Sequence, residues 1–463
     1  MGLFSILHTS RDALAAQSRG LETTGQNIAN VNTPGYARRT VVLEPRPYGK
    51  GAYGGVDAVE IRRLSDRFLE QRFFEKSGLS ASADERDQQL AQIDGLFDES
   101  VSKRIGGSLD QFFSSFSTLA ARPNDPTTRA QVLASAENLS SEVRDAADTI
   151  ATLRGSLATQ AAGVVGQVNE LAANIAKLNK QVEAAENAGA DAVDLKDQRN
   201  TLIEQLSQKV DIKVITADSG RLTIQAAGAT LIDGDIARSL SINVDSNGGL
   251  KLLAQRSGGP PMDVTSGLSG GTLDGIFQVR DSDLATVATR LDNFAYDVAT
   301  AINAQHAQGF GLDGANGRNL FSLSATPAGA ARSLKLDAQL SGQPDRLAAS
   351  SAATFLPGGS DNALAISQIA AQAIAGGGTR IPSEDFAALI GQVGQLKAGA
   401  ASTAATQQAL KAQSFDLKEA VSGVSIDEEM ISLTKYQRAY EASTKVLQTV
   451  DQLLQELIAR LGR

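Results

Sequence analysis

Apolar residues recur every seven positions near both ends of the chain. This spacing is typical of a helix with a narrow apolar stripe. The first helix is predicted to end near Asn27 to Asn30, because the run Asn30-Val-Asn-Thr-Pro-Gly35 favours a tight turn. The stripe of this helix consists of Leu7, Leu14, Leu21 and Ile28.

The final helix has the longer stripe. Ser425-Ile-Asp-Glu428 fits a capping box, so the helix should begin there. The acidic trio from Asp427 to Glu429 suits the positive end of a helix dipole better than a metal site. The apolar positions are Ile426, Leu433, Tyr440, Leu447, Leu454 and Leu461, with Tyr436, Val450 and Leu457 in the second seam.

Neither stripe can remain in water, so each must be covered. The simplest arrangement is an antiparallel pair of the two terminal helices within one chain. Two helices make only a thin core, and the remaining stripe would then pack on other copies of the chain. When such contacts join different surfaces of neighbouring copies, head to tail, they build helical tubes.

The pattern changes twice in the middle of the chain. Residues 40–61 contain two strand-like runs around a Pro/Gly/Tyr segment, which indicates a long hairpin or an extended linker. Residues 64–210 have helical spacing, and residues 211–253 alternate with period two between Asp-Gly and Asn-Gly turns. Helical spacing returns near Gly271 and continues, with interruptions, to the end.

These changes predict a mainly α fold with a small inserted antiparallel β domain. We expect residues 1–62 with 423–463 to form a terminal-helix assembly domain with the hairpin as linker. Residues 63–210 with 271–312 and 363–422 should form a helical bundle domain. Residues 211–270 with 313–362 should form a small outer β domain.

Composition removes several classes of function. The 463 residues include no Cys and two His, which excludes disulfides and thiolate sites and argues against a polyhistidine metal centre. The net charge of −9 argues against a nucleic-acid coat. No run approaches the roughly 20 apolar residues of a membrane span, and the N-terminus does not resemble a cleavable secretory signal.

Candidate chemical sites each have a simpler structural interpretation. His8 has no evident partner for catalysis. His306 should be a helix-end capping or packing residue, where a cation suits the dipole. Asp313-Gly-Ala-Asn-Gly317 lacks the distal acid of a calcium loop and should be a turn, and Gly376-Gly-Gly378 lacks a following Gly-Lys-Ser/Thr and should be a linker. We therefore expect no enzyme activity, no metal and no cofactor.

Two motifs at opposite ends carry a family resemblance. Asn27-Ile-Ala-Asn-Val-Asn-Thr-Pro-Gly-Tyr-Ala-Arg38 resembles the N-terminal signature of the bacterial flagellar rod, hook and hook-associated proteins. The C-terminal signature is similar to residues 422–449, including Tyr436-Gln-Arg-Ala-Tyr-Glu-Ala-Ser443. Three features favour the junction members of this family. They are Tyr36-Ala-Arg38, Ala301-Ile-Asn-Ala-Gln-His-Ala-Gln-Gly309 and the long helical region before the β unit.

The resemblance implies a structural subunit of the flagellum, in a ring of identical copies between hook and filament. It implies export by the flagellar type III apparatus without a cleaved signal peptide, and thus an extracellular place at the hook–filament junction. The implied partners are other copies of the chain, the hook protein, hook-associated protein 3, the filament and a cytoplasmic export chaperone. A hook or distal-rod subunit remains the alternative within the family.

The resemblance and the stripes together assign two sets of contact residues. The export chaperone is expected on Leu447, Leu454, Leu457 and Leu461, by helix-in-groove recognition. Subunit packing is expected at Leu7, Leu14, Leu21, Ile28, Asn30, Pro34, Gly35, Tyr36, Leu433, Tyr436, Tyr440, Leu447, Val450, Leu454 and Leu457.

Two rivals come from other classes. A hydrolase on a helical scaffold would need converging polar groups, which the sequence does not reveal, and a turnover screen would test it. A phage-tail or secreted adhesin component would share the structural character, and gene neighbourhood would separate it from a flagellar protein.

Overall fold

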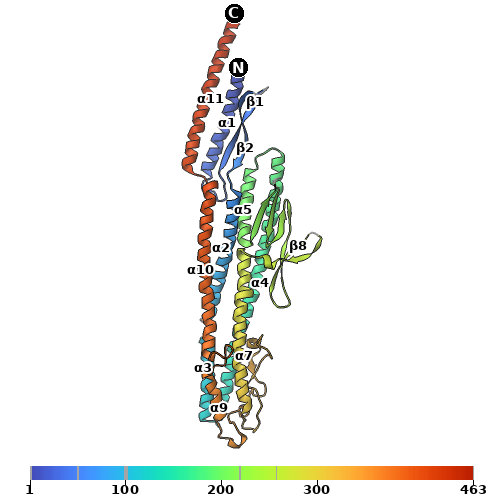
Figure 1. Ribbon diagram of the computed structural model, residues 1–463, viewed down its shortest axis with the longest axis vertical. Helices are drawn as coiled ribbons and strands as arrows, with labels where there is room; N and C mark the ends of the chain where they lie inside the picture. Colours follow the sequence, from blue (N-terminus) through green and yellow to red (C-terminus); the bar gives the residue numbers. More distant parts are fainter. Residues whose placement is uncertain (1–2, 49–51, 98–102, 218–220, 257, 462–463) are drawn as a thin grey trace.

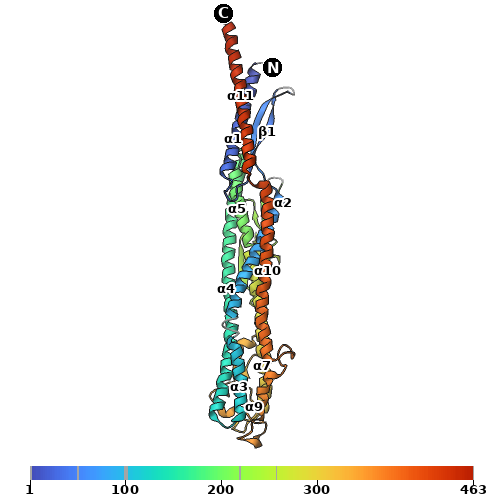
Figure 2. The same ribbon diagram turned by 90° about the vertical axis from the view of Figure 1, so that its left-hand side faces the viewer.

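The computed structural model describes residues 3–48, 52–97, 103–217, 221–256 and 258–461. The molecule is long and narrow, and both termini lie at the same end (Figures 1 and 2). Long helices run lengthwise and determine this shape. The helices are α1 Leu3–Ala29, α2 Arg67–Leu96, α3 Lys103–Ala121, α4 Pro126–Asn187, α5 Val193–Lys209, α6 Gly271–Gln278, α7 Leu284–Gln308, α8 Ala330–Ser333, α9 Asp361–Gln368, α10 Pro382–Ser422 and α11 Ile426–Leu461.

Local sequence explains where these helices begin and end. Asp66 caps α2 by accepting hydrogen bonds from the backbone of Phe68 and Leu69. Asp125 caps α4 in the same way, and Pro126 occupies the first helical position, where its missing N–H costs nothing. The break between α3 and α4 falls at the Pro-containing residues 122–125, and the predicted start of the final helix is confirmed.

The predicted strands of residues 211–253 are also confirmed, as two small antiparallel sheets. One has the order β3-β4-β5-β6 and the other β7-β8-β9. Figure 1 shows this β unit beside α4, midway along the molecule. The strands are β3 Ile212–Thr216, β4 Leu222–Ala226, β5 Ala229–Asp233, β6 Ile236–Ala237, β7 Leu240–Val244, β8 Leu250–Arg256 and β9 Gly259–Asp263.

Residues 39–63 form a hairpin rather than an extended linker. Strands β1 (Arg39–Tyr48) and β2 (Ala52–Arg63) pair antiparallel, with register shifts after Val42 and Arg46. The hairpin lies along α1 near the end of the molecule that holds both termini (Figure 1). We call α1, this hairpin and α11 together the terminal unit, and the rest of the chain the body.

The body contains one continuous hydrophobic core. Phe112 packs edge-on against Phe113 and Phe116 at one end, and the rings of Phe294 and Phe386 lie 5.5 Å apart. Among the described residues, every buried member of this core lies between residues 73 and 400. The terminal unit therefore meets the body without sharing its core.

Residues 313–362 lie apart from the β unit with which the sequence analysis grouped them. They pack on α3, α4 and α7 at the far end of the molecule, where β10 (Phe321–Ser322) pairs with β11 (Lys335–Leu336) (Figure 1). Side chains of the neighbouring helices hold them there, and two examples show how. Asn303 of α7 accepts hydrogen bonds from the backbone of Leu320 and Phe321, and buried Arg129 of α4 donates to the carbonyl of Leu347.

The short helical turns are η2 Thr265–Gly267, η3 Val279–Asp283, η4 Pro344–Arg346, η5 Ala353–Phe355 and η6 Ile369–Ala371. η3 is a π-helical turn that joins α6 to α7, so the predicted helix from Gly271 to about Gln308 is nearly continuous. In the part of the chain that the structure describes, helices with the length and apolar character of a membrane span are absent.

Candidate functional site: the elbow and the terminal helix pair

The two terminal helices pack side by side and antiparallel, as predicted (Figures 1 and 2). Gly20 is the point of close approach. A Cβ atom at Gly20 would lie 2.6 Å from the ring of Tyr436, so only glycine leaves room for that ring. The pairing therefore uses the aromatic residue that the sequence placed in the second seam.

The predicted packing residues are covered to different degrees within one chain. Val450 is buried, while Tyr440 and Leu457 are 41% and 47% exposed. The side chain of Leu461 lies outside the described residues, as do those of Tyr48 and Tyr53. Pro34 and Gly35 are exposed, and the half-buried positions are Leu7, Leu14, Leu21, Ile28, Asn30, Tyr36, Leu433, Tyr436, Leu447 and Leu454.

Asn27 connects the two signature motifs. Its side-chain amide donates to the carbonyl of Arg39 (2.9 Å) and to a carboxylate oxygen of Glu429 (3.0 Å). Its Oδ1 accepts from the backbone N–H of Arg39 (3.0 Å) and from the hydroxyl of Tyr36 (2.8 Å). Since Asn27 is 1% exposed, these bonds are made away from water, where an unmade bond is costly.

Glu429 is the second residue of this connection. It is 2% exposed and also accepts from Nε of Arg38 at 2.7 Å, while the same guanidinium reaches Glu428. The acidic trio was predicted to have only a dipole role, whereas in the structure Glu429 bonds directly to Asn27 and Arg38 of the N-terminal signature. Nothing in helix-start spacing distinguishes Glu429 from Asp427, so this role was missed.

The turn after α1 rests on α5. A Cβ atom at Gly35, whose φ is +81°, would lie against the hydroxyl of Thr201, so both the conformation and the space require glycine. Arg39 extends between Asp194 (2.6 Å) and Asp197 (2.7 Å) of α5, below the ring of Tyr36. Burial lowers the pKa of Arg39, but hydrogen bonds to the two carboxylates raise it more, and the guanidinium stays charged.

Backbone bonds complete the connection where the chain passes twice between terminal unit and body. Arg38 N donates to the carbonyl of Ser422, and Leu64 N donates to the carbonyl of Arg38, both at 2.8 Å. We call this region, around Arg38, Leu64 and Ser422, the elbow. It joins both ends of the sequence to α5 through polar groups.

The other candidate residues have structural surroundings. His306 is fully buried, with Nδ1 2.7 Å from the carbonyl of Arg318 and Nε2 accepting from the backbone N–H of Ala348. It is a packing residue, but the expected cation is wrong, because burial lowers the pKa of His306 to about 4. Asp313 pairs with Arg318 in a turn, and His8 is exposed on α1.

The glycines of residues 376–378 form a tight loop in which all three have positive φ. In the described ranges, no group of three or more His, Asp or Glu side chains has the arrangement of a metal site.

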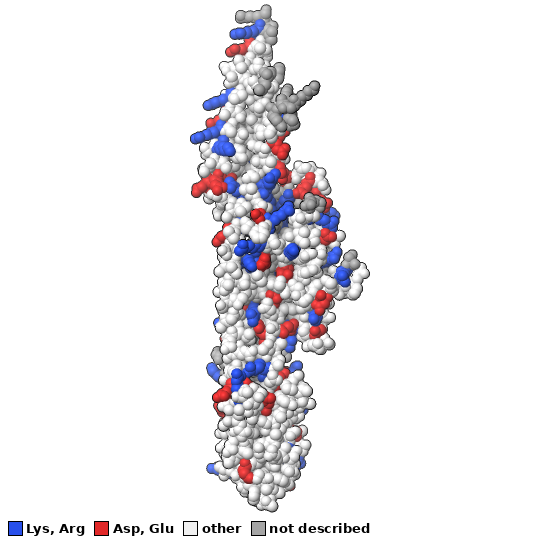
Figure 3. All heavy atoms as spheres, in the orientation of Figure 1, with Lys and Arg blue, Asp and Glu red and all other residues white. Residues whose placement is uncertain are grey.

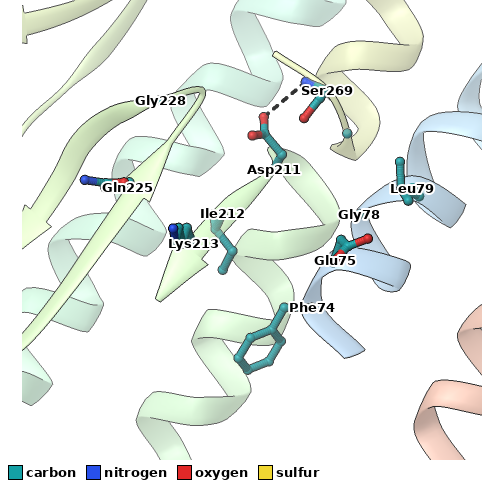
Figure 4. A pocket seen from close by; sticks show the side chains of 11 residues that line it. Phe74, Glu75, Gly78, Leu79, Asp211, Ile212, Lys213, Gln225, Gly228 and Ser269 are labelled. Carbon is teal, nitrogen blue, oxygen red and sulfur yellow. Dashed lines mark hydrogen bonds between the residues drawn. The ribbon is translucent and has the colours of Figure 1, made fainter. Parts of the chain in front are cut away.

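A cavity of about 460 Å³ lies between α2 and the start of β3. Figure 4 shows Phe74, Gly78 and Leu79 of α2 on one side and Asp211 with Ser269 on the other. Ser269 N donates to Asp211 at 3.3 Å. A Cβ atom at Gly78 would lie 2.9 Å from the carbonyl of Ser207, so glycine lets α2 approach the body closely here.

Comparison with known proteins gives a consistent result along the whole chain. Residues 90–321 match the model of the flagellar hook-associated protein FlgK helical domain. Residues 7–36 match that of the flagella basal body rod protein, and residues 420–461 match that of the flagellar basal body rod FlgEFG protein C-terminal region. The last two matches contain the stripes that pair in the terminal unit.

Full-length relatives agree with these matches. The flagellar hook-associated protein 1 of Bacillus subtilis is 27% identical over 99% of this chain and 98% of its own. That of Escherichia coli K12 is 25% identical over 98% of this chain and 99% of its own. The structure of the flagellar hook junction protein FlgK from Burkholderia pseudomallei has a similar fold, with a TM-score of 0.67, 16% identity and coverage of 76% of this chain and all of that one.

Proposed function

Because the chain belongs to the flagellar hook-associated protein FlgK family, we propose that it forms a ring of identical subunits joining hook to filament. The family is structural, and its members are components of the flagellum. The ring, its neighbours and the route of export are parts of the proposal. The exposed apolar side chains of α11 support it most directly.

α11 exposes several large apolar side chains, which is unusual for a free surface. Ile431 and Ile458 are 71% and 67% exposed, and Leu453 is 48% exposed. The last turns of α11 also extend past the described start of α1 (Figure 1), so α1 does not cover them. A neighbouring subunit that covered these residues would remove apolar surface from water, which favours assembly.

The terminal unit has little core of its own. Among its described residues and those of the turn after α1, only Ala16, Ala37 and Val450 are buried apolar side chains. Such a unit gains much of its stability from neighbours, which suits a part that is unfolded for export and ordered on assembly. We propose type III export without a cleaved signal, and an extracellular place at the junction.

The same helix would serve the export chaperone before assembly. Leu447 and Leu454 lie on the seven-residue stripe and are half-buried, and Leu457 of the second seam is exposed. An amphipathic helix of this kind fits an apolar groove. After export, the stripe would meet other copies of the chain, with the hook protein on one side of the ring and hook-associated protein 3 and the filament on the other.

A deletion strain tests the proposed position. Bare hooks, with flagellin released into the medium, are the expected result in electron microscopy and in an assay of the medium. Absent hooks would instead indicate the hook or distal-rod alternative, and normal filaments would refute a role at the junction.

Complementation then tests the assembly surface. The pair Leu447→Asp and Leu454→Asp should fail to restore filaments while the body keeps its melting transition, because a charge on the stripe opposes burial. The matched control is Gln448→Asp with Gln455→Asp, which places the same charges with the same spacing at exposed positions. Equal failure of the control would show that charge on α11, rather than loss of the stripe, blocks assembly.

A further inference from the structure

We propose that a pocket beside the elbow binds an oxyanion through Arg199 and Arg67. The pocket has a volume of about 510 Å³. Its walls are the base of β2, the first turns of α2, the end of α4, one side of α5 and β3. Figure 3 shows charged side chains of both signs gathered around the level of the hairpin base and α5, whereas the far end of the molecule is almost uncharged on this face.

The charges that line this pocket do not balance. Five cationic side chains face three carboxylates, and each carboxylate already has a cationic neighbour. The separations are 3.6 Å for Arg62 and Glu60, 3.8 Å for Arg63 and Glu70, and 2.6 Å for Lys196 and Glu186. Arg67 and Arg199 are the remaining cations.

Arg199 is the more confined of these two arginines. Its Nη1 donates to Oδ1 of Asn179 at 3.0 Å, and within the described ranges no carboxylate comes within salt-bridge distance of it. Burial, and then the charge of Arg63, lower the pKa of Arg199, while Glu186 and Glu70 oppose this only in part. A negative charge added in the pocket would offset both the burial of the Arg199 guanidinium and its repulsion by Arg63.

Arg67 approaches the pocket from the first turn of α2. The described residues offer its guanidinium no salt bridge either. The positive end of the α2 dipole adds to the attraction for an anion there. A guanidinium presents paired N–H donors that match two oxygens of a carboxylate, phosphate or sulfate, so the shared ligand chemistry is an oxyanion.

Two sources could supply that group. One is a free inorganic anion, and the other is an Asp or Glu side chain of a second copy of this chain. The second source rests on the proposed function, because it requires the ring. The binding test below uses the single full-length chain, so it succeeds or fails independently of the position of the protein in the flagellum.

The test is a titration of the full-length protein with inorganic phosphate, with chloride adjusted to hold the ionic strength constant. Calorimetry should give a saturable signal, and Arg199→Gln should weaken binding by about tenfold or more, as expected for loss of a charge-assisted bond. Arg67→Gln should weaken it as well. Arg62→Gln is the matched control, since Arg62 lines the same pocket but pairs with Glu60, and it should change the affinity by no more than about twofold.

Three outcomes would overturn the proposal. They are no saturable binding by the unmodified protein, binding that Arg199→Gln and Arg67→Gln leave intact, and equal weakening by Arg62→Gln, which would indicate general charge attraction. Melting curves in chloride verify that each variant is folded, and Arg67→Gln keeps the test decisive should Arg199→Gln unfold.

Sedimentation at high protein concentration then distinguishes the two sources. If a second copy supplies the carboxylate, phosphate competes with it and weakens self-association. If self-association is unchanged while phosphate binds, the ligand is a free anion.

Discussion

His306 should make the stability of the body depend on pH. The ring accepts a hydrogen bond from Ala348 N at 3.1 Å through Nε2, and Nδ1 lies 2.7 Å from the carbonyl of Arg318. Only the neutral imidazole with its proton on Nδ1 satisfies both contacts. Burial lowers the pKa of His306 to about 4, from an ordinary value near 6.5.

The sign of the effect follows from which state binds the proton first. In the unfolded chain His306 is protonated as the pH falls through about 6.5, whereas in the folded protein it stays neutral until about 4. Between these two pH values the unfolded state therefore binds more protons than the folded state. The free energy of unfolding decreases as the pH is lowered through this range. At about 1.4 kcal/mol per unit the full loss is about 3 kcal/mol, of which about 2 kcal/mol is reached by about pH 5.

Urea unfolding of the body at about pH 7.5 and about pH 5 measures this loss, for the unmodified protein and for His306→Gln. Carboxylates titrate in both proteins and cancel in the comparison. The unmodified protein should lose about 2 kcal/mol more than the variant over this interval. Parallel losses, or a folded-state imidazole that titrates near its ordinary pKa by NMR, would refute the reasoning.

Three further predictions concern the terminal unit, and amide exchange of α1 and α11 in dilute monomer measures all of them. Both helices should exchange faster than the body, because their apolar stripes are only partly covered; equal protection would contradict this. Gly20→Ala should speed exchange, because its Cβ would lie against Tyr436. Gly25→Ala has open space around it and should slow exchange, because alanine stabilises a helix by about 1 kcal/mol relative to glycine. Slower exchange in both variants would refute the steric argument. Asn27→Ala should cost about 3 kcal/mol by leaving several buried groups unpaired, and the exposed Asn32→Ala should have little effect; equal effects would show that Asn27 is not the connection we describe.

The long helices and most strands could be predicted because their signals are local. The seven-residue stripes identified α1 and α11, and alternation with Asp-Gly and Asn-Gly turns identified β3, β4, β5, β7 and β8. Residues 313–362 carry little periodicity, and their position depends on contacts far along the chain. One of these is the bond between Arg129 and the carbonyl of Leu347, which no short-range pattern reveals.

The elbow could be predicted only in part. The two signature motifs identified the segments that meet, but not the bonds between them. Asn27 and Glu429 are 402 residues apart in sequence, and each looks like an ordinary helix-end polar residue. His306 was expected near a helix dipole, yet its surroundings come from the loop that holds Ala348, so burial decided its charge.

The side-chain amide of Asn27 forms hydrogen bonds with both the N–H and the C=O of a single residue, Arg39. Asn169 does the same for Leu240 at the start of β7, and Asn303 does so for Phe321 in β10. Gln71 of α2 bonds two residues of β3 instead, the carbonyl of Ile212 and the N–H of Val214. Each takes the place of a neighbouring strand that the small sheet lacks. An extended segment of this kind depends on an amide side chain from a distant part of the sequence. Recombination that exchanged the segment between relatives would preserve its hydrogen bonds only if the helix with that amide were exchanged too.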